Sequence, residues 1–547
     1  MTPRRLALAL AAGLALADAS IVTLALPDLL QALDTTVEGV AAIIGVYTVV
    51  LALTLLPAER LMRELGPRGV GAAGFAVFAV ASALCGVAGS LEALLVFRAL
   101  QALGGAAGLV AVFALLAGGD EAPSARRLWL GVAVLSTAVG PALGGALTQA
   151  FSWEAIFLVQ APVAGLAVVA CLGAVEPRPA AIAAAPRRSV AAGLALALVS
   201  AALTAVLFLL VLLLVAGWGV SPLGAAAAVI VLPLAALAGA RFGGPARARA
   251  AAGCLLVAGG TAALAFLPDA SLGWTVLPQV LAGVGMGLAL PALAGELLPE
   301  RDAADAAWLL TLRHAGIALA LVVLAPVTAD RLDDATERAR ERGVALVLDA
   351  RLPPADKISL APDLLAGVDA EEPRAGLRDA LDRQRDRYVT GTPERSAFDA
   401  LAARADDTLV AAVGESFLTA FLITGGFAVA GGLLLLPRVG HPAWVAAAVL
   451  AGAGVTGATA ALRGRVAPEP VAIRDPCQGR ELPGSGGITG FLQDRALEVL
   501  DRNACELGAT REEYVLALAD PDDAERFERE YGRDPRATAG ILGALLG

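Results

Sequence analysis

Histidine and cysteine, the side chains that most often hold metal ions in proteins, are scarce in this chain. Its 547 residues include two histidines, His314 and His441, and five cysteines without a Cys-x-x-Cys pair. The sequence also lacks a recognisable nucleophile–base arrangement and a glycine-rich phosphate loop. These absences argue against a metal site, and against an enzyme or a protein that depends on a bound cofactor.

Apolar sequence, by contrast, is abundant: 58% of the residues are hydrophobic and the mean hydropathy is +0.73. Crossing about 30 Å of hydrocarbon takes roughly 20 apolar residues, and thirteen stretches are long enough. We therefore expect an all-α polytopic membrane protein. The stretches lie near residues 6–26, 39–57, 70–88, 93–117, 128–149, 155–174, 191–217, 222–240, 250–267, 274–293, 306–327, 416–436 and 442–462.

Arginine is missing from four short loops, around residues 28–38, 90–92, 217–222 and 269. Cytoplasmic loops carry the excess of basic residues in membrane proteins, so these loops are expected outside and the N-terminus inside. With thirteen spans, the C-terminus then lies outside the cell membrane. The arginines assigned to the inner side are Arg4, Arg5, Arg60, Arg63, Arg68, Arg126, Arg127, Arg178, Arg187, Arg188, Arg241, Arg247, Arg249, Arg301 and Arg438.

Two long stretches, residues 330–414 and 463–547, are too polar to enter the membrane. The first is rich in Arg, Asp and Glu with apolar residues at helical spacing, which predicts a helical insertion. Both stretches follow odd-numbered spans, so both are expected outside. In the second, Thr510 and Glu513 have the spacing of a capping box. Further helix starts are predicted at Asp520-Pro521 and Asp534-Pro535, and a flexible glycine-rich lead at 484–487.

The five cysteines divide by position. Cys85, Cys171 and Cys254 lie inside predicted spans, where a thiol behaves as a small hydrophobic group. Cys477 and Cys505 both lie in the outward tail, and a pair in an oxidising compartment predicts a disulfide.

Charged residues inside predicted spans are costly in lipid and are functional candidates by default. Asp18 lies in the middle of the first span, Arg98 in the fourth with Gln101 one turn later, and Arg313 and His314 in the eleventh. Structural roles remain open for each charge. Asp18 could pair with an arginine, Arg98 could join two helices, and Arg313 could extend its side chain to the interface.

The fifth span holds two stripes of small residues at helical spacing. Ser136, Gly140 and Gly144 form one stripe, and Thr137, Pro141 and Gly145 form the other. Small residues let helix backbones approach closely in lipid, and Pro141 removes one internal hydrogen bond. The stretch fits either general tight packing or a specific motif with a kink.

In these residues the chain resembles the major facilitator superfamily, and within it the drug:proton antiporter branch with fourteen spans. The resemblance covers about residues 1–330 and 416–436. It rests on five segments in order: residues 18–27 (first-span acid motif), Arg98-x-x-Gln101 (fourth-span arginine motif), GPALGG at 140–145 (antiporter motif), residues 151–157 (entry to the sixth span), and Arg313 with Gly316 (a late-span motif).

The chain departs from the family pattern between the second and third spans. Aligned on Gly66, the acid and base at Arg63 and Glu64 are exchanged, and Glu59 stands at the position of a leading glycine, with Arg68 following. This puts the usual gating salt link in doubt, although an exchanged pair could still bridge. The extra central pair of spans of that branch is absent as well.

The resemblance implies two six-helix halves with one appended span. The predicted divisions are residues 1–174 (N-terminal half), 175–190 (cytoplasmic linker), 191–329 with 415–437 (C-terminal half), 330–414 (insertion), 441–462 (thirteenth span) and 463–547 (outer C-terminal domain).

The resemblance also implies export of small lipophilic compounds in exchange for protons, by alternating access. Asp18 would carry the proton, because a carboxyl in a low dielectric can cycle between charged and neutral forms. Arg98 would control that protonation or hold an anionic substrate, and Gln101, Arg313 and His314 would line the substrate pathway. The implied partners are the lipid bilayer, a small-molecule substrate and protons. The protein would be a monomer, with no nucleic acid and no cofactor beyond the proton motive force.

Two other functions fit part of the sequence. One is proton symport or uniport of a nutrient, against which the antiporter motif argues. The other is a receptor or scaffold that displays the outer domains without transport, an alternative that the altered 59–68 segment keeps open.

Overall fold

The computed structural model describes residues 3–23, 25–117, 132, 140, 143–175, 189–297, 303–357, 360, 373–437, 439–467, 471–479 and 487–538. All regular secondary structure in these ranges is helical, which confirms the predicted all-α fold class.

The chain forms two compact units, and each is described by itself. Unit 1 comprises residues 1–215, 220–330 and 417–466, and unit 2 comprises residues 216–219, 331–416 and 467–547. Unit 2 thus combines the two polar stretches that the sequence analysis treats as separate domains. Its compactness means that the insertion and the tail fold as one body.

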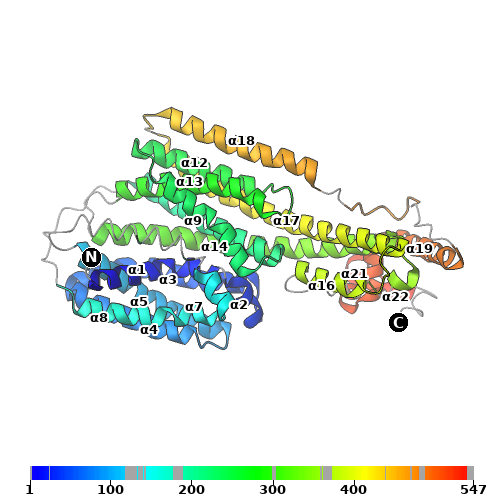
Figure 1. Ribbon diagram of the computed structural model, residues 1–547, viewed down its shortest axis with the longest axis horizontal. Coiled ribbons are helices and arrows are strands. Elements are labelled where there is room, and N and C mark those ends of the chain that lie inside the picture. Colours follow the sequence, from blue (N-terminus) through cyan, green and yellow to red (C-terminus); the bar gives the residue numbers. More distant parts are fainter. Residues whose placement is uncertain are drawn as a thin grey trace. The chain divides into compact units, whose positions relative to one another are not determined.

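Unit 1 is a bundle of helices, drawn in Figure 1 from blue through green to orange. Its helices are α1 (Pro3–Thr23), α2 (Leu26–Ala32), α3 (Val37–Leu65), α4 (Pro67–Cys85), α5 (Leu91–Ala117), α7 (Glu154–Leu158), α8 (Gln160–Leu172), α9 (Val190–Leu212) with a π-helical turn after it (Leu213–Gly217), α10 (Pro222–Val229), α11 (Val231–Gly239), α12 (Ala246–Leu264), α13 (Leu272–Leu297), the first part of α14 (Ala303–Asp349), the last part of α17 (Pro393–Leu435), and α18 (Pro442–Val466).

Eleven helical segments in the described residues are long and apolar enough to cross a membrane. They coincide with eleven of the thirteen predicted spans. Of the other two, residues 250–267 lie largely on α12, and residues 128–149 are described only at 132, 140 and 143–149. The total of thirteen stays a prediction, as does the side on which each loop lies.

Close backbone approach holds the bundle together. A methyl group built on Gly104 of α5 would lie 2.5 Å from the backbone nitrogen of Phe78 on α4. On the other side of the unit, a methyl group on Gly253 of α12 would lie 2.4 Å from the carbonyl oxygen of Gly285 on α13. Lipid tails are as apolar as leucine, so such van der Waals contact between small residues is what drives helices together in a membrane.

Helix α18 is attached to the bundle along one face, beside α12 (Figure 1). A methyl group on Gly259 of α12 would lie 2.3 Å from the Cα atom of Gly452 on α18. Thr456 donates to the carbonyl of Gly259 at 3.0 Å, and Arg463 donates to the carbonyl of Ala265 at 3.2 Å. Side-chain donors therefore hold both the middle and the end of α18 against α12.

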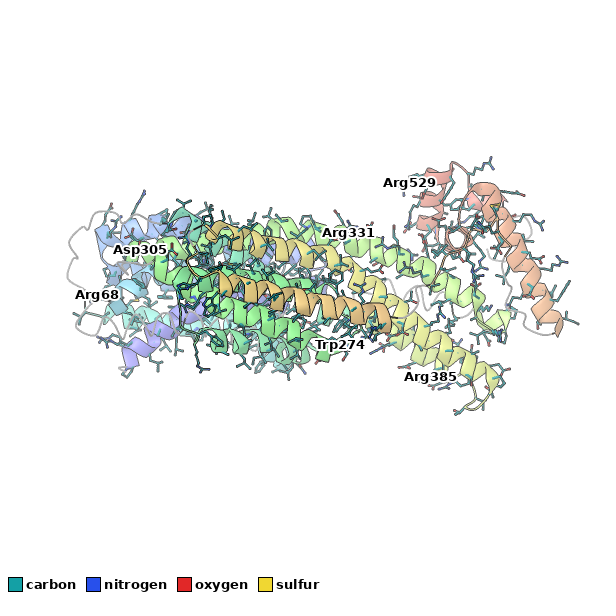
Figure 2. The ribbon with its side chains drawn as sticks, turned by 90° about the horizontal axis from the view of Figure 1, so that it is seen from above. Arg68, Trp274, Asp305, Arg331, Arg385 and Arg529 are labelled. Carbon is teal, nitrogen blue, oxygen red and sulfur yellow. A yellow bond between two sulfur atoms is a disulfide. The ribbon has the colours of Figure 1, made fainter. Side chains whose placement is uncertain are left out.

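The ends of unit 1 can be followed in Figure 2, where Arg68 and Asp305 lie at one end and Trp274 lies toward the other. Arg68 belongs to a predicted inner loop, and Trp274 follows the predicted outer loop at Asp269. Residues predicted on opposite sides of the membrane thus lie at opposite ends of the bundle.

Residues 59–68, which join the second and third predicted spans, are mostly helical and do not form a loop. Helix α3 continues to Leu65, and Gly66 alone connects it to α4 at Pro67. Residues 59–65 are mostly strong helix formers, so they extend the spanning helix beyond its apolar part. Gly66 has φ of +85°, a conformation that disfavours residues with a Cβ atom and ends the helix.

Unit 2 is built from shorter polar helices around a small apolar core. That core includes Leu497, Ala504, Tyr514 and Phe527 of the tail, with Leu348 of the insertion packed against it. The helices are the last part of α14, α16 (Pro373–Arg385), the first part of α17, α19 (Gly487–Leu507), α20 (Arg511–Ala519), α21 (Pro521–Tyr531) and α22 (Pro535–Thr538). In Figure 2, Arg331, Arg385 and Arg529 mark three of these helices.

Local signals in the tail fold as the sequence predicts. Thr510 and Glu513 form the capping box of α20, with both reciprocal hydrogen bonds present. Asp520 caps α21, with Pro521 as the first helical residue. Asp534 accepts from the backbone nitrogen of Arg536 at the start of α22. In the predicted glycine-rich lead, Gly487 is the first residue of α19, and residues 484–486 lie outside the described ranges.

A disulfide joins Cys477 to Cys505, which confirms that prediction. The bond spans 28 residues of sequence, and on the chain-entropy model a loop of this size stabilises a domain by roughly 3–4 kcal/mol. Cys85, Cys171 and Cys254 are buried free thiols within helices, as expected for small apolar groups in a bundle.

Candidate functional site

Asp18 lies in the interior of α1, with its side chain fully buried. The neighbouring polar side chains of this helix return hydrogen bonds to their own backbone, Ser20 to the carbonyl of Ala17 and Thr23 to that of Ala19. Because these hydroxyls satisfy themselves locally, they cost the apolar helix little. Asp18 cannot do so, and its carboxylate needs partners from other helices.

Arg98 of α5 supplies the first partner. Its Nη1 atom lies 2.5 Å from the Asp18 Oδ2 atom, and both side chains have zero exposed area. The guanidinium also donates from Nε to the carbonyl of Ile43 on α3 at 3.1 Å, and it lies 4.4 Å from the centre of the Tyr47 ring. Two residues separated by 80 positions in the sequence thus form a buried ion pair. This geometry fits both a structural and a functional role.

Two glutamines complete the site. Gln101 accepts from Arg98 Nη1 at 2.6 Å, and it donates to Gln160 Oε1 at 3.1 Å and to Ser82 Oγ at 2.8 Å. Gln160, at the start of α8, donates to Asp18 Oδ1 at 2.9 Å. Both glutamines are fully buried. Four helices, α1, α4, α5 and α8, therefore contribute to one polar cluster, which we call the Asp18 cluster: Asp18, Ser82, Arg98, Gln101 and Gln160.

Sequence reasoning missed Gln160 and Tyr47. Gln160 is the only polar side chain between residues 155 and 174 apart from the thiol of Cys171, and this isolation was the available signal. Tyr47 donates its hydroxyl to the carbonyl of Ala15 on α1 at 2.9 Å. One Arg98 nitrogen, Nη2, is buried without a hydrogen-bond partner among the described residues, and contact of the guanidinium with the rings of Tyr47 and Phe157 compensates in part.

The small residues of the fifth span lie directly against the helix that carries Asp18. A methyl group on Gly140 would lie 2.0 Å from the Ser20 hydroxyl oxygen, and one on Gly144 would lie 2.1 Å from the Ile21 carbonyl oxygen. Only glycine allows this approach, because a Cβ atom at Gly144 would overlap backbone. Gly145 is buried in the same helical segment, and Pro141 lies outside the described residues.

The other candidate residues lie in the second half of unit 1. His314 of α14 is buried, and its Nδ1 atom lies 2.8 Å from the carbonyl oxygen of Leu310 in the same helix. Gly316 packs against α9, where a methyl group would lie 1.9 Å from the carbonyl oxygen of Ala197. Arg313 directly precedes His314 on α14. These residues form a separate location from the Asp18 cluster.

The altered segment between α3 and α4 makes different contacts from a gating salt link. Arg63 pairs with Glu59 of its own helix at 3.0 Å, and Glu64 is exposed. Arg68 donates to the carbonyl of Leu172 at the end of α8, at 2.6 Å. Arg68 thus ties the start of α4 to α8 through a backbone oxygen rather than a carboxylate.

In the described part of the chain, His, Cys, Asp and Glu side chains form no group of three or more that could hold a metal ion.

The family model described as Major Facilitator Superfamily matches residues 8–326. The matched range contains the Asp18 cluster, the glycines of the fifth span, and Arg313 and His314.

Among curated proteins, the chain is 38% identical over 173 residues to the tetracenomycin C resistance and export protein of Streptomyces glaucescens, covering 31% of this chain and 32% of that protein. It is 31% identical over 166 residues to the methylenomycin A resistance protein of Bacillus subtilis, covering 30% and 36%. It is 37% identical over 164 residues to the multidrug efflux pump LfrA of Mycolicibacterium smegmatis, covering 26% and 32%. The matches thus span about a third of each relative's length.

Among solved structures, a bacterial homolog to the human lysosomal transporter Spinster, in an inward-facing and occupied conformation, superposes with a TM-score of 0.53 at 16% identity. The superposition covers 79% of this chain and 97% of that one. At this identity the likeness concerns the fold alone.

Proposed function

The chain belongs to the major facilitator superfamily, and from that premise we propose that it is a secondary active transporter that exports small lipophilic compounds in exchange for protons. The observation that carries the proposal is the fully buried pair of Asp18 and Arg98, 2.5 Å apart. The relatives with resistance and export names make antibiotics and other drug-like metabolites the first substrates to test.

The energetics of the pair supply a reason for exchange. Two charges buried together are tolerated because each compensates the other, whereas removing one leaves the other uncompensated at a cost of about 3–5 kcal/mol. Protonation of Asp18 has this effect, because it leaves the Arg98 guanidinium without its counter-charge. The protonated state then favours a conformation in which Arg98 reaches water or another anion. A proton thus shifts the balance between two conformations.

The contact between α1 and the fifth-span glycines would transmit this conformational change to the rest of the bundle. Ser20 and Ile21 lie two and three residues beyond Asp18, and they contact Gly140 and Gly144. Any displacement of α1 that accompanies release of Arg98 moves this tightly packed contact. We infer that α1 slides on the glycine face as the two halves rock around a midplane site.

Roles along the substrate path follow from the same assignment. Arg313 and His314 would face the substrate from the second half. Gln101 is engaged with Arg98, Gln160 and Ser82, so in this conformation it supports the Asp18 cluster. The segment around Arg63, Glu64, Gly66 and Arg68 would gate the inner side through the Arg68 contact to α8.

The proposal is tested with the full chain in inverted membrane vesicles, using tetracenomycin C, methylenomycin A and a panel of lipophilic dyes. We expect uptake that is driven by an imposed pH gradient and abolished by a protonophore. Asp18→Asn keeps shape and hydrogen bonding but removes titration, so it should abolish gradient-driven uptake while leaving expression intact. Undiminished protonophore-sensitive uptake by this variant would rule out Asp18 as the carrier. Attention would then turn to His314, or to Glu296 of α13, whose Oε1 atom lies 3.7 Å from Arg247 Nη1.

A further inference from the structure

The hydrogen bonds of the Asp18 cluster form a closed ring with a defined direction. Arg98 donates to Asp18 and to the Gln101 oxygen, the Gln101 nitrogen donates to the Gln160 oxygen, and the Gln160 nitrogen donates to Asp18. Each amide therefore has one acceptor and one donor committed within the ring. The orientation of both amides is fixed by Arg98, which can only donate, and by a carboxylate, which can only accept.

Protonation of Asp18 turns one of its oxygens from a hydrogen-bond acceptor into a donor, so the directions of the hydrogen bonds in the ring must change. A proton on Oδ1 becomes a donor aimed at Gln160, which satisfies it only by turning its amide so that the oxygen faces Asp18. The Gln160 nitrogen then faces Gln101, and Gln101 must turn in the same way. After that turn the Gln101 nitrogen faces Arg98, and two donors oppose each other.

The turn of Gln101 also changes its contacts with α4, where Cys85 Sγ donates to Gln101 Oε1 at 4.0 Å. Ser82 donates to the carbonyl of Phe78 at 2.7 Å while it accepts from Gln101, and its hydroxyl can rotate to donate to a turned Gln101. With the proton on Oδ1, Oδ2 still accepts from Arg98 as a neutral carbonyl oxygen, as does the carbonyl of Ile43. Protonation thus removes the counter-charge of Arg98 directly, and it removes the Gln101 acceptor through the amides.

We propose that Gln160 and Gln101 are positioning residues that transmit the protonation of Asp18 to Arg98. The inference rests on the proposed function, in which Asp18 carries the proton. Among the residues that the structure describes, the charged and titratable groups that face the ring are Arg98 of α5, Tyr47 of α3 and Cys85 of α4. Tyr47 donates to backbone, and the Cys85 sulfur lies 4.0 Å from Gln101 Oε1, so neither occupies an Asp18 oxygen.

The experiment uses the full chain in liposomes and records pH-difference infrared spectra, in which a protonated carboxyl has its own band. The band lost in Asp18→Asn is assigned to Asp18. Gln160→Met keeps the length of the side chain and removes the donor to Oδ1, so the pH midpoint of the band should rise by about one unit. The matched control is Gln279→Met, because Gln279 is equally buried but bonds to Thr275 of its own helix.

A second variant, Gln101→Met, separates transmission from direct contact. Gln101 does not touch Asp18, so the midpoint should move less than in Gln160→Met. Gradient-driven uptake should nevertheless fall about tenfold, as for loss of one hydrogen bond to a charged group, and by a larger factor than substrate counterflow does. This combination is not expected from a residue that only supports packing.

Several outcomes overturn the relay. Equal midpoints in wild type, Gln160→Met and Gln279→Met would show that Gln160 does not hold the carboxylate. Wild-type coupling in Gln101→Met would show that Arg98 responds to Asp18 alone. If Gln160→Met unfolds in a thermal melt, Gln101→Met decides the question by itself. Persistence of every carboxyl band in Asp18→Asn, with coupled uptake retained, would instead refute the proposed function.

Discussion

Each unit of the protein buries an arginine almost completely, and the two arginines have different surroundings. Arg98 in unit 1 has one carboxylate partner, Asp18, and its other partners are neutral. Arg511 in unit 2 lies within ion-pair distance of Asp349, Glu512 and Asp501. Burial works against the charge of Arg511, but these acids raise its pKa above the ordinary value. An arginine with several acids stays charged and fixed, whereas one with a single titratable acid loses its counter-charge when one proton binds.

The largest expected effect is a loss of stability in unit 2 when Arg511 is replaced. Arg511→Met removes the buried cation of a network in which Glu512 has zero exposed side-chain area, and it should destabilise unit 2 by about 3–5 kcal/mol. Hydrogen exchange over residues 487–538 measures this loss in the full chain. Arg529→Met is the control, because Arg529 is exposed and bonds only within its own helix in the described contacts. Equal exchange in the two variants would mean that the buried network adds no stability.

The second prediction concerns Arg98, and here transport rather than stability should change. Arg98→Lys keeps the charge, but an ammonium group cannot reproduce the planar set of donors to Asp18, Gln101 and the Ile43 carbonyl. Gradient-driven export should fall about a hundredfold, as expected when two charge-assisted hydrogen bonds are lost. Arg511→Lys serves as the comparison, with lower stability and unchanged export per folded molecule. Near-normal export by Arg98→Lys would indicate that the charge alone suffices.

A smaller effect is expected at the glycine face. Gly144→Ala places a methyl group 2.1 Å from the Ile21 carbonyl oxygen, so α1 must shift away, and export should fall about tenfold for an overpacking cost of this kind. Gly165→Ala on α8 meets no atom within 4 Å and should transport normally. Equal rates in both variants would contradict the role given to the contact between α1 and the fifth span.

The smallest effect is a pH dependence confined to unit 2. Burial, and then the carboxylates of Glu513, Glu337 and Glu512, raise the pKa of Glu341 from 4.5 to about 7. The folded unit therefore binds more protons than the unfolded chain between these values, so its stability falls as the pH rises through this window. Thermal melts at pH 5 and pH 8 should differ in this direction, and Glu341→Gln should reduce the difference. A melt that is equally pH-dependent in Glu341→Gln would assign the effect to another group.

Site residues could be predicted from the sequence where placing the side chain in lipid costs much free energy. Asp18, Arg98 and Gln101 could be singled out because charges, and polar residues beside them, rarely enter apolar spans without a role. Gln160 and Tyr47 passed unnoticed because a single amide or phenol costs little in a membrane helix. Their partners, the Asp18 carboxylate and the Ala15 carbonyl, are set by packing between helices and leave no mark in local sequence.

The fold, too, could be predicted where it depends on local sequence and not where it depends on contacts between distant residues. Helix type, the caps at Thr510 and Asp520, and the pairing of Cys477 with Cys505 follow from short-range patterns. The union of the insertion and the tail does not, because it rests on contacts such as Arg340 with Asp523 and Arg511 with Asp349. These residues are charged like their neighbours and lie 183 and 162 positions apart, so neither periodicity nor composition distinguishes them.

The construction of unit 2 from two distant segments has a consequence for biosynthesis. Leu348 and Asp349 are made well before their partners in α19 and α20, and α18 is synthesised in between. During translation, Leu348 of the insertion therefore stays without its partners from the tail until every helix of unit 1 has been synthesised. A chain that stops early lacks these partners. Unit 2 can therefore be completed only after every helix of unit 1 has been synthesised.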